Sequence, residues 1–283
     1  MLRKLKKLKG FIITALVIII LAACAFLIPL KVETVDSAFL LSSHIGSDIK
    51  LVAHRGLSSL YPENTIPAFE GAAEYGFEAV ELDIHTTKDG EWVVIHDEVV
   101  DHMTDSEGEV KDFTLKEIRS LNIDSGSHIE QQGMRGSRLM IPTLRETLDV
   151  CKETGIVPVI ELKGGELNQL PSLKALLDEY EFSDEAIIIS FYEEYIEEYR
   201  KLDSDIEIMY LATAPTRADI DWCIEHNFGI NYSWYCLYKS LPAVIYAKAK
   251  GLSTGVWTVD IPVVGDFVAL LGVDFITTNK ILP

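Results

Sequence analysis

The feature that most constrains the fold is the alternation of short apolar runs with amphipathic segments along most of the chain. From Lys50 onward, eight strand-like runs alternate with helix-like runs. Strands that lie between two layers of apolar side chains need covering on both faces, which an outer ring of helices provides. The pattern therefore predicts an α/β fold, a parallel (β/α)₈ TIM barrel, and a doubly wound open sheet is the alternative. The length of 283 residues suits one such barrel.

The expected elements follow from the period of the apolar residues and from turn signals. The expected strands cover residues 50–54, 79–84, 156–162, 186–191, 206–212, 228–232, 253–259 and 274–278. The expected helices cover residues 64–75, with Asn64 as its cap, and 143–153, 171–180, 193–201, 217–226, 242–250 and 263–271. The Asp89-Gly90 turn predicts a hairpin formed by residues 91–96 outside the barrel. Residues from about 97 to 140 are polar and irregular, and they form an expected insertion after the second strand.

The N-terminal segment differs in composition from the rest of the chain. Residues 1–10 hold five basic residues and no acid, and residues 11–30 are uncharged and mostly apolar. Twenty such residues suffice to cross a bilayer as a helix. The basic flank predicts a cytoplasmic tail at residues 1–10, a transmembrane anchor at 11–30 and a linker at 31–49. The domain formed by residues 50–283 would then lie outside the cell.

A lipoprotein signal is the alternative reading of this segment. The stretch Leu21-Ala22-Ala23-Cys24 is similar to a bacterial lipobox that ends at a lipidated cysteine. The apolar run continues beyond Cys24, where a mature lipoprotein usually becomes polar, so we favour the uncleaved anchor. Both readings leave the domain tethered to the cell membrane.

Charge and cysteine content exclude two classes of partner. The chain has 44 acidic and 25 basic residues, and five of the basic ones lie in the first ten residues. Such a surface repels a phosphate backbone, so we expect no nucleic-acid partner. Cys151, Cys223 and Cys236 form no C-x-x-C motif, which excludes a typical zinc site. A disulfide between Cys223 and Cys236 stays open for an extracellular domain.

Charged residues gather where the predicted barrel strands end. The stretch VELDI places Glu81 and Asp83 on one face of a strand, and VIELKG places Glu161 and Lys163 in the same way. The carboxyl ends of parallel strands meet at one rim of a barrel. Carboxylates that converge there repel one another unless a cation lies between them. Oxygen ligands favour a hard divalent metal, Mg²⁺ or Ca²⁺.

Two histidines and two basic residues surround this predicted metal site. His54 and Arg55 follow the first strand, and His96 ends the hairpin. Histidines can exchange protons near neutral pH, while Arg55 and Lys163 suit the oxygens of a phosphate group. Phe191 and Trp257 lie at strand ends, where they line a substrate groove or belong to the core. The remaining histidines are expected to be structural or surface residues: His44, His85, His102, His128 and His226.

With these residues assembled, the chain resembles the glycerophosphodiester phosphodiesterase family. The resemblance rests on AHRG, PENTIPAF, VELDIHTTKDG, VVIHD, IELKG, IIISF and GVWTV, in that order from Leu51 almost to the C-terminus. It implies a barrel with an insertion after IHD and hydrolysis of small or lipid-derived phosphodiesters. In this family a glycerol hydroxyl is thought to attack phosphorus and expel the alcohol, and water then opens the cyclic phosphate.

By similarity, each candidate residue acquires a role. His54 and His96 would be the acid/base pair, and Glu81, Asp83 and Glu161 would hold one divalent metal ion. Arg55 and Lys163 would contact the phosphate.

Two positions depart from the family pattern. His102 stands where an arginine is usual, and Asn279 stands where the last strand usually ends in Thr-Asp.

Two other functions compete with hydrolysis of glycerophosphodiesters. One is a phospholipase-like barrel of the C or D type that acts on lysolipids or cell-wall polymer. The other is a catalytically dead module that binds lipid or wall polymer through a metal. The intact His54 and His96 favour an enzyme.

Overall fold

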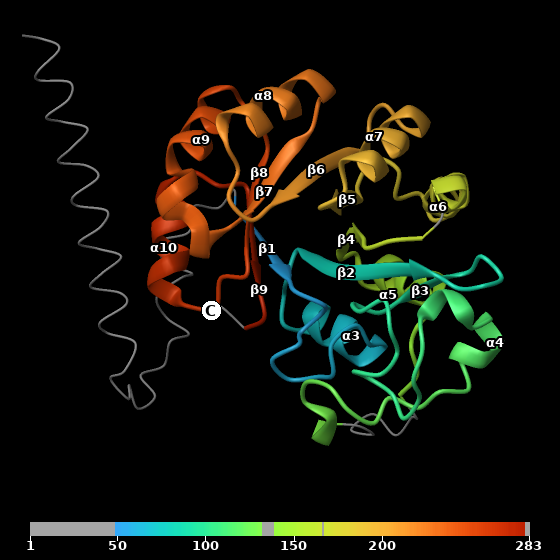
Figure 1. Ribbon diagram of the computed structural model, residues 1–283. Coiled ribbons are helices and arrows are strands. Elements are labelled where there is room, and N and C mark those ends of the chain that lie inside the picture. The colour runs from blue at the N-terminus through green and yellow to red at the C-terminus, as the bar shows by residue number, and fades with distance from the viewer. Residues whose placement is uncertain (1–48, 132–138, 166, 281–283) are drawn as a thin grey trace, which may run out of the picture.

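Eight parallel strands close into a barrel at the centre of the structure, a computed structural model that describes residues 49–131, 139–165 and 167–280 (Figure 1). The strands are β1 (Lys50–Ala53), β2 (Ala79–Thr86), β4 (Val157–Leu162), β5 (Ile187–Ser190), β6 (Glu207–Ala212), β7 (Gly229–Ser233), β8 (Thr254–Trp257) and β9 (Phe275–Thr278). Neighbours in the barrel are neighbours in sequence, and β1 pairs with both β2 and β9. The predicted (β/α)₈ barrel is confirmed, and the open sheet is excluded because the pairing of β1 with both neighbours closes the ring.

Strand β2 is longer than the barrel needs, and its far end serves a second pairing. Its first residues pair with β1, whereas Ile84, His85 and Thr86 pair antiparallel with β3 (Trp92–Val94). The predicted hairpin is therefore confirmed, with a shorter second strand than expected. The hairpin reverses the chain direction at the rim of the barrel, and His96 lies two residues after the end of β3.

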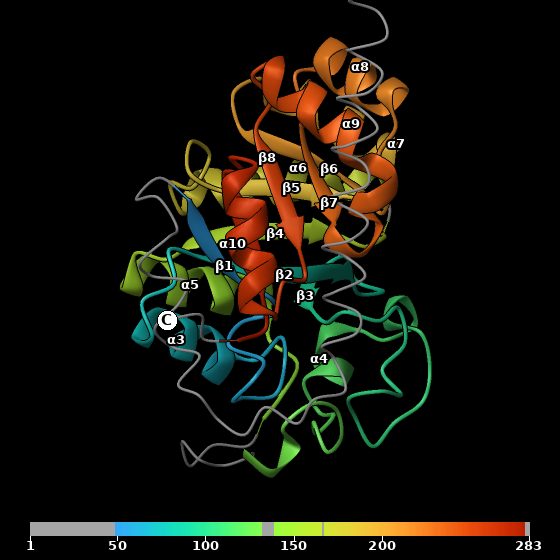
Figure 2. The same cartoon turned by 90° about the vertical axis from the view of Figure 1, so that its left-hand side faces the viewer.

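Helices surround the barrel, as Figures 1 and 2 show from two directions. They are α3 (Ile66–Glu74), α4 (Leu115–Ile118), α5 (Leu144–Thr154), α6 (Leu170–Glu179), α7 (Glu193–Leu202), α8 (Arg217–His226), α9 (Leu237–Ala249) and α10 (Pro262–Leu270). Two expectations about helix starts are wrong. The cap of α3 is Thr65, because Asn64 adopts φ 53° and turns its side chain into the barrel rim. Helix α9 begins at Leu237 and continues through Pro242, because the buried Leu237 and Ser240 pack its first turn against the barrel.

Two apolar layers hold the barrel together. Inside it, a cluster that includes Val52, Val159, Ile187 and Met209 fills the interior below the rim. Outside it, alternate strand residues pack against the helices, with fully buried side chains such as Leu148 of α5. The polar residues at the upper strand ends therefore stand on an apolar floor.

The segment between β3 and α5 forms a small apolar cluster of its own. The cluster includes Val100, Met103, Val110, Ile118 and Ile123, and it packs against β3. The described part of this segment holds three short helical elements: α4 and the 3₁₀ turns Val110–Asp112 and Ile129–Gln131. This segment overlaps the predicted insertion and lies to one side of the barrel, near α4 in Figure 1.

Two expectations from the sequence concern the anchor and the cysteines. The predicted anchor at residues 11–30, with Cys24, lies outside the described residues. Within residues 49–131, 139–165 and 167–280, no helix combines the length and apolar content that crossing a bilayer requires. The disulfide left open between Cys223 and Cys236 is not formed. Both thiols are free, and that of Cys223 is buried in the core between α8 and the barrel.

The outer apolar layer generates a prediction about stability. Leu148→Ala removes a fully buried side chain and should lower the free energy of unfolding by about 2–5 kcal/mol. Leu270→Ala makes the same change on a helix where the side chain is 86% exposed, so it should cost less than about 1 kcal/mol. Urea unfolding followed by circular dichroism measures both, and equal losses would contradict the packing described for α5.

Candidate active site

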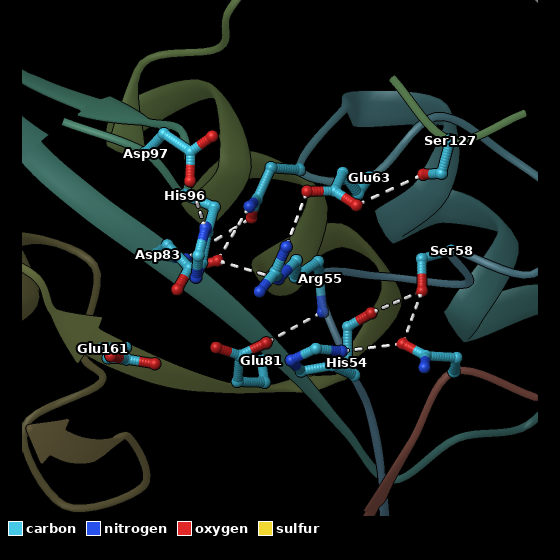
Figure 3. Close-up of polar contacts among 12 residues, drawn as sticks. His54, Arg55, Ser58, Glu63, Glu81, Asp83, His96, Asp97, Ser127 and Glu161 are labelled. Atoms are coloured by element: carbon cyan, nitrogen blue, oxygen red, sulfur yellow. Dashed lines mark hydrogen bonds and ion pairs between the residues drawn. The ribbon is translucent and has the colours of Figure 1, made fainter. Parts of the chain in front are cut away.

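The predicted site residues meet at the carboxyl-terminal rim of the barrel, as Figure 3 shows for most of them. His54 follows β1, Glu81 and Asp83 lie on β2, and Glu161 lies on β4. These strands are neighbours, and Asp83 pairs in register with Glu161. A cavity of about 170 Å³ at this rim is lined by His54, Arg55, Glu81, His96, Glu161, Lys163, Phe191 and Trp257. Asp83 completes the set because its carboxylate lies beside those of Glu81 and Glu161.

The loop after β1 is shaped by residues with positive φ. Arg55 has φ 56° and Gly56 has φ 78°, values in the left-handed region that residues other than glycine rarely adopt. A Cβ at Gly56 would come within 2.7 Å of the backbone of Ala68 in α3, so only glycine fits there. The turn points the backbone N–H of Arg55 at Glu81, to whose Oε2 it donates at 2.8 Å. The His-Arg-Gly sequence thus brings a backbone donor to the acidic cluster.

Three buried carboxylates form the centre of the site. One oxygen from each of Glu81, Asp83 and Glu161 lies within 4.8 Å of the other two, and the residues are 2%, 1% and 8% exposed. Burial and the neighbouring acids raise the pKa of Glu81 well above its ordinary value and that of Glu161 to about 7. Burial also acts to raise the pKa of Asp83, but Arg55, His96 and Lys163 outweigh it and hold that pKa below its ordinary value.

Two cations flank this carboxylate cluster without saturating it. Arg55 Nε lies 3.4 Å from Asp83 Oδ2, and Lys163 Nζ lies 3.1 Å from Glu161 Oε1 and 3.6 Å from Asp83 Oδ1. Asp83 Oδ1 is buried and accepts no hydrogen bond from the residues that the structure describes. A cluster of carboxylate oxygens with a buried oxygen to spare fits a hard divalent cation.

The two histidines lie on opposite sides of the cluster in different surroundings. His54 Nδ1 is 2.7 Å from Asn279 Oδ1, and burial followed by the charge of Arg55 lowers the pKa of His54. His96 Nδ1 is 2.6 Å from Asp97 Oδ1, and His96 Nε2 is 2.9 Å from Lys163 Nζ. An ammonium group only donates, so His96 Nε2 accepts and its proton lies on Nδ1, toward Asp97.

The sequence did not point to several residues that complete the site. Glu63 Oε1 binds Arg55 Nη1 at 2.7 Å, and Asn64 Nδ2 donates to Asp83 Oδ2 at 2.8 Å. Both belong to the PENT stretch, in which the sequence predicts only the start of a helix. Asn231 of β7 lines the same cavity and is 4% exposed, and within the described part of the chain its buried Oδ1 accepts no hydrogen bond. A single asparagine in an apolar strand does not by itself indicate a site. The available signal was that a polar side chain stood in a strand expected to be buried.

Trp257 and Phe191 form one wall of the cavity. Their rings meet edge to face at 5.7 Å between centroids, and the buried Trp257 Nε1 donates no hydrogen bond to any described residue. Of the two positions considered from the sequence, a substrate groove or the core, the structure places both side chains at the lining of the cavity. This aromatic wall thus presents the indole N–H of Trp257 as a donor available to a ligand.

Comparison with known proteins decides the family. A family model described as the glycerophosphoryl diester phosphodiesterase family matches residues 54–282. The chain belongs to this family. The resemblance stated from the motifs is therefore confirmed, and this phosphodiesterase is a hydrolase of phosphoric diesters.

Named relatives from distant organisms agree. A glycerophosphodiester phosphodiesterase of Caldanaerobacter subterraneus subsp. tengcongensis is 34% identical over 234 residues, which cover 81% of this chain and 93% of that protein. Glycerophosphodiester phosphodiesterase 1 of Homo sapiens is 30% identical over 242 residues, which cover 75% of this chain and 72% of the human protein.

Solved structures are similar along nearly their whole length. A glycerophosphodiester phosphodiesterase from Parabacteroides distasonis is 25% identical with a TM-score of 0.69, covering 82% of this chain and 93% of its own. A phosphodiesterase from Oleispira antarctica, solved with the product sn-glycerol-3-phosphate, has 23% identity and a TM-score of 0.74, covering 86% and 96%. The second likeness shows the fold alone.

The carboxylate cluster predicts how a cation should stabilise this phosphodiesterase. Because the folded-state pKa of Glu161 is about 7 against an ordinary 4.5, its neutral form stabilises the metal-free fold at low pH. That contribution is lost as pH rises from about 4.5 through 7. A cation binds the ionised form, so Mg²⁺ or Ca²⁺ should raise the unfolding temperature more at about pH 8 than at about pH 5. At a concentration of about 100 times the Kd, the gain is about 2.7 kcal/mol.

Thermal unfolding with and without the cation, or with a chelator, measures this effect. Glu161→Gln should abolish most of the cation-dependent gain, whereas Glu185→Gln, at an exposed position before β5, should leave it intact. A cation effect that is larger at low pH, or unchanged in Glu161→Gln, would contradict a metal site at these carboxylates.

Proposed function

We propose that this phosphodiesterase hydrolyses glycerophosphodiesters to glycerol phosphate and an alcohol, with His54 and His96 as acid/base pair and a divalent cation on the carboxylate cluster. The observation that carries the proposal is the convergence of both histidines, both cations and the carboxylates of Glu81 and Glu161 on one cavity. Two proton-transfer groups with separate partners suit a reaction that needs one base and one acid.

The cation would be held by Glu81, Asp83 and Glu161, whose oxygens suit Mg²⁺ or Ca²⁺ better than zinc. When bound, such an ion supplies positive charge that neutralises phosphate oxygens and favours ionisation of a nearby hydroxyl. Arg55 and Lys163 would also bind the phosphate oxygens. Their ion pairs with Asp83 are longer than direct hydrogen bonds, so both groups have donors left for the phosphate.

We assign the histidines by their partners. The hydroxyl next to the phosphate attacks phosphorus and loses its proton to His54, whose lowered pKa keeps the ring neutral at physiological pH. The bond from phosphorus to the alcohol oxygen breaks, and His96 gives that oxygen a proton. Asp97 accepts from His96 Nδ1 at 2.6 Å and orients the ring, so that Nε2 can carry the transferred proton once Lys163 turns from it to the phosphate. Water then opens the cyclic phosphate with the two roles reversed.

The side of the cavity formed by Asn231, Trp257 and Phe191, here called the far wall, has polar atoms that suit the glycerol hydroxyls. Asn231 Oδ1 can accept a hydrogen bond from one hydroxyl, and Trp257 Nε1 can donate a hydrogen bond to a hydroxyl oxygen. Both atoms are buried without a partner in the described residues. Phe191, packed against Trp257, would cover the carbon chain. The alcohol would leave toward a second cavity of about 530 Å³, which shares Lys163 and is bordered by Glu98 and Glu109 of the inserted segment.

We further propose that the enzyme works at the outer surface of the cell membrane. The proposal rests on the basic residues 3–9 and the apolar residues 11–30, with lipidation of Cys24 as the alternative anchor. A tethered enzyme would meet small or lipid-derived phosphodiesters close to the bilayer.

The acid/base assignment predicts the effect of removing either histidine. His54→Ala and His96→Ala should each lower kcat/KM for glycerophosphocholine by about 10²–10⁴-fold, the usual contribution of a positioned acid or base. His226→Ala, on the far end of α8, should leave activity unchanged. Release of glycerol phosphate from glycerophosphocholine and glycerophosphoethanolamine is measured with Mg²⁺, with Ca²⁺ and with chelator.

Each pattern of release has a meaning. Metal-dependent release that survives His54→Ala would remove that residue from the mechanism. Release from lysolipids or wall polymer alone would favour the phospholipase-like reading. Binding of these ligands without any turnover would favour the binding module.

The far wall predicts a separate effect on binding. Asn231→Leu keeps the shape but removes the amide, so it should weaken binding of sn-glycerol 3-phosphate about 3- to 12-fold, the value of one hydrogen bond. Inorganic phosphate, which lacks the glycerol carbons, should bind as before. Isothermal titration calorimetry compares the two ligands, and an equal loss for both would contradict a role in hydroxyl recognition.

A further inference from the structure

A chain of hydrogen bonds lies behind His54, at the ends of β8 and β9. His54 Nδ1 is 2.7 Å from Asn279 Oδ1, and Asn279 Nδ2 is 2.8 Å from Asp260 Oδ2. Asp260 Oδ1 accepts from the backbone N–H of Asn279 at 2.8 Å and from the Thr278 hydroxyl at 3.0 Å. The carboxylate of Asp260 thus holds the amide that contacts the histidine.

The direction of every bond in this chain follows from Asp260. An ionised carboxylate only accepts, so the atom of the Asn279 side chain that faces it must be the NH₂ group. The amide oxygen is then the atom that faces His54, and Ser58 Oγ also lies 3.1 Å from it. Because an amide oxygen only accepts, His54 Nδ1 must donate. The proton of the neutral ring therefore lies on Nδ1, and the lone pair lies on Nε2.

The position of the ring is fixed by the same strand. The backbone N–H of His54 donates to Thr278 O at 2.9 Å, so the histidine and its amide partner are both anchored to the end of β9. His54 lines the substrate cavity, and Nε2 is the nitrogen that Asn279 leaves available. A base must present a lone pair to the hydroxyl that it deprotonates, and the other tautomer would present a proton instead.

We propose that Asn279 and Asp260 are a positioning pair that locks His54 in the tautomer with its proton on Nδ1, so that Nε2 can act as the base. This inference rests on the proposed function for its catalytic consequence, but the lock itself is a property of the fold. Neither residue lines the substrate cavity, so both act only through His54. An aspartate at position 279 would also accept from His54, but it would face Asp260 at hydrogen-bond distance, where two carboxylates repel. The amide separates the acid from the histidine and transmits its orientation.

The proposal makes an unusual prediction for Asp260→Asn. The new side chain keeps an oxygen for the two donors at Thr278 and Asn279 N, and it turns an NH₂ group toward the Asn279 side chain. The Asn279 amide must then flip to present its oxygen to that group and its NH₂ group to His54. His54 Nδ1 becomes an acceptor, and its proton moves to Nε2.

Nitrogen NMR of the full-length chain in detergent, labelled with ¹⁵N-histidine, reads this directly. The nitrogen with the lone pair resonates far downfield of the nitrogen with the proton, and His54→Gln assigns the His54 signals among the seven histidines. We expect the proton on Nδ1 in the unmodified chain and on Nε2 in Asp260→Asn. Asp184→Asn, at an exposed turn before β5, removes the same charge and should leave the tautomer unchanged.

Kinetics and an exchanged pair complete the test. Asp260→Asn should lower kcat for glycerophosphocholine about 10- to 100-fold with little change in KM, because the base is misprotonated while the substrate contacts remain. The double variant Asn279→Asp/Asp260→Asn exchanges the two groups and again offers His54 only an acceptor. It should restore the Nδ1 proton and, because a carboxylate behind His54 also favours the charged ring, recover most of kcat only at alkaline pH, where the ring is neutral.

The outcomes separate this inference from the proposed function. An unchanged tautomer in Asp260→Asn, or a double variant as impaired as the single one at alkaline pH, would overturn the positioning pair. Folding of each variant is checked by circular dichroism, and Asn279→Ser provides a second way to remove the amide if Asp260→Asn unfolds. A chain that hydrolyses no glycerophosphodiester while His54 changes tautomer as expected would overturn the proposed function and leave the lock standing.

Discussion

The whole rim of the barrel depends on the repulsion among three buried carboxylates. Glu81, Asp83 and Glu161 are almost fully buried and lie within 4.8 Å of one another, an arrangement that is unfavourable without positive charge. The rest of the site answers this constraint. Arg55 and Lys163 flank the cluster, a backbone N–H points at Glu81, and Asn64 donates to Asp83. These compensations are partial, and that is why the cluster suits a divalent cation.

The barrel makes such a costly site possible. Its strands are fixed by helices outside and by an apolar floor inside, so the charged side chains at the rim cannot move apart. The loops above the rim then supply what the strands lack. The positive φ values of Arg55 and Asn64 belong to one short loop whose two ends both reach the carboxylates. Backbone strain of this kind persists where the surrounding structure fixes the residue.

The two histidines show how one residue type is given two characters. His54 is buried beside Arg55 with a neutral amide behind it, whereas His96 has the carboxylate of Asp97 behind it. The two rings therefore have different partners at Nδ1, and burial followed by the charge of Arg55 lowers the pKa of His54. This contrast follows from the neighbours of each ring and requires no difference between the side chains themselves.

The sequence by itself determined the barrel and most of the site. The alternation of strands and helices is a repeating pattern, and Glu81, Asp83 and Glu161 stand at strand positions where the barrel topology brings them to one rim. Local patterns could not show which loop residues turn inward. Asn64 gave the signal of a helix cap because asparagine favours that position, but its contact with Asp83 outweighs that preference.

Only the tertiary structure decided the partners of the histidines and the inner polar wall. Asn279 and Asp260 are 19 residues apart, and His54 is 225 residues from Asn279, so no spacing rule connects them. From the sequence, Asn279 was a departure from the family pattern, and Asp260 carried no signal. Closure of the barrel brings β9 beside β1 and places these residues in contact. The strand order fixes which elements meet, but hydrogen-bond directions depend on side chains that meet only in the folded chain.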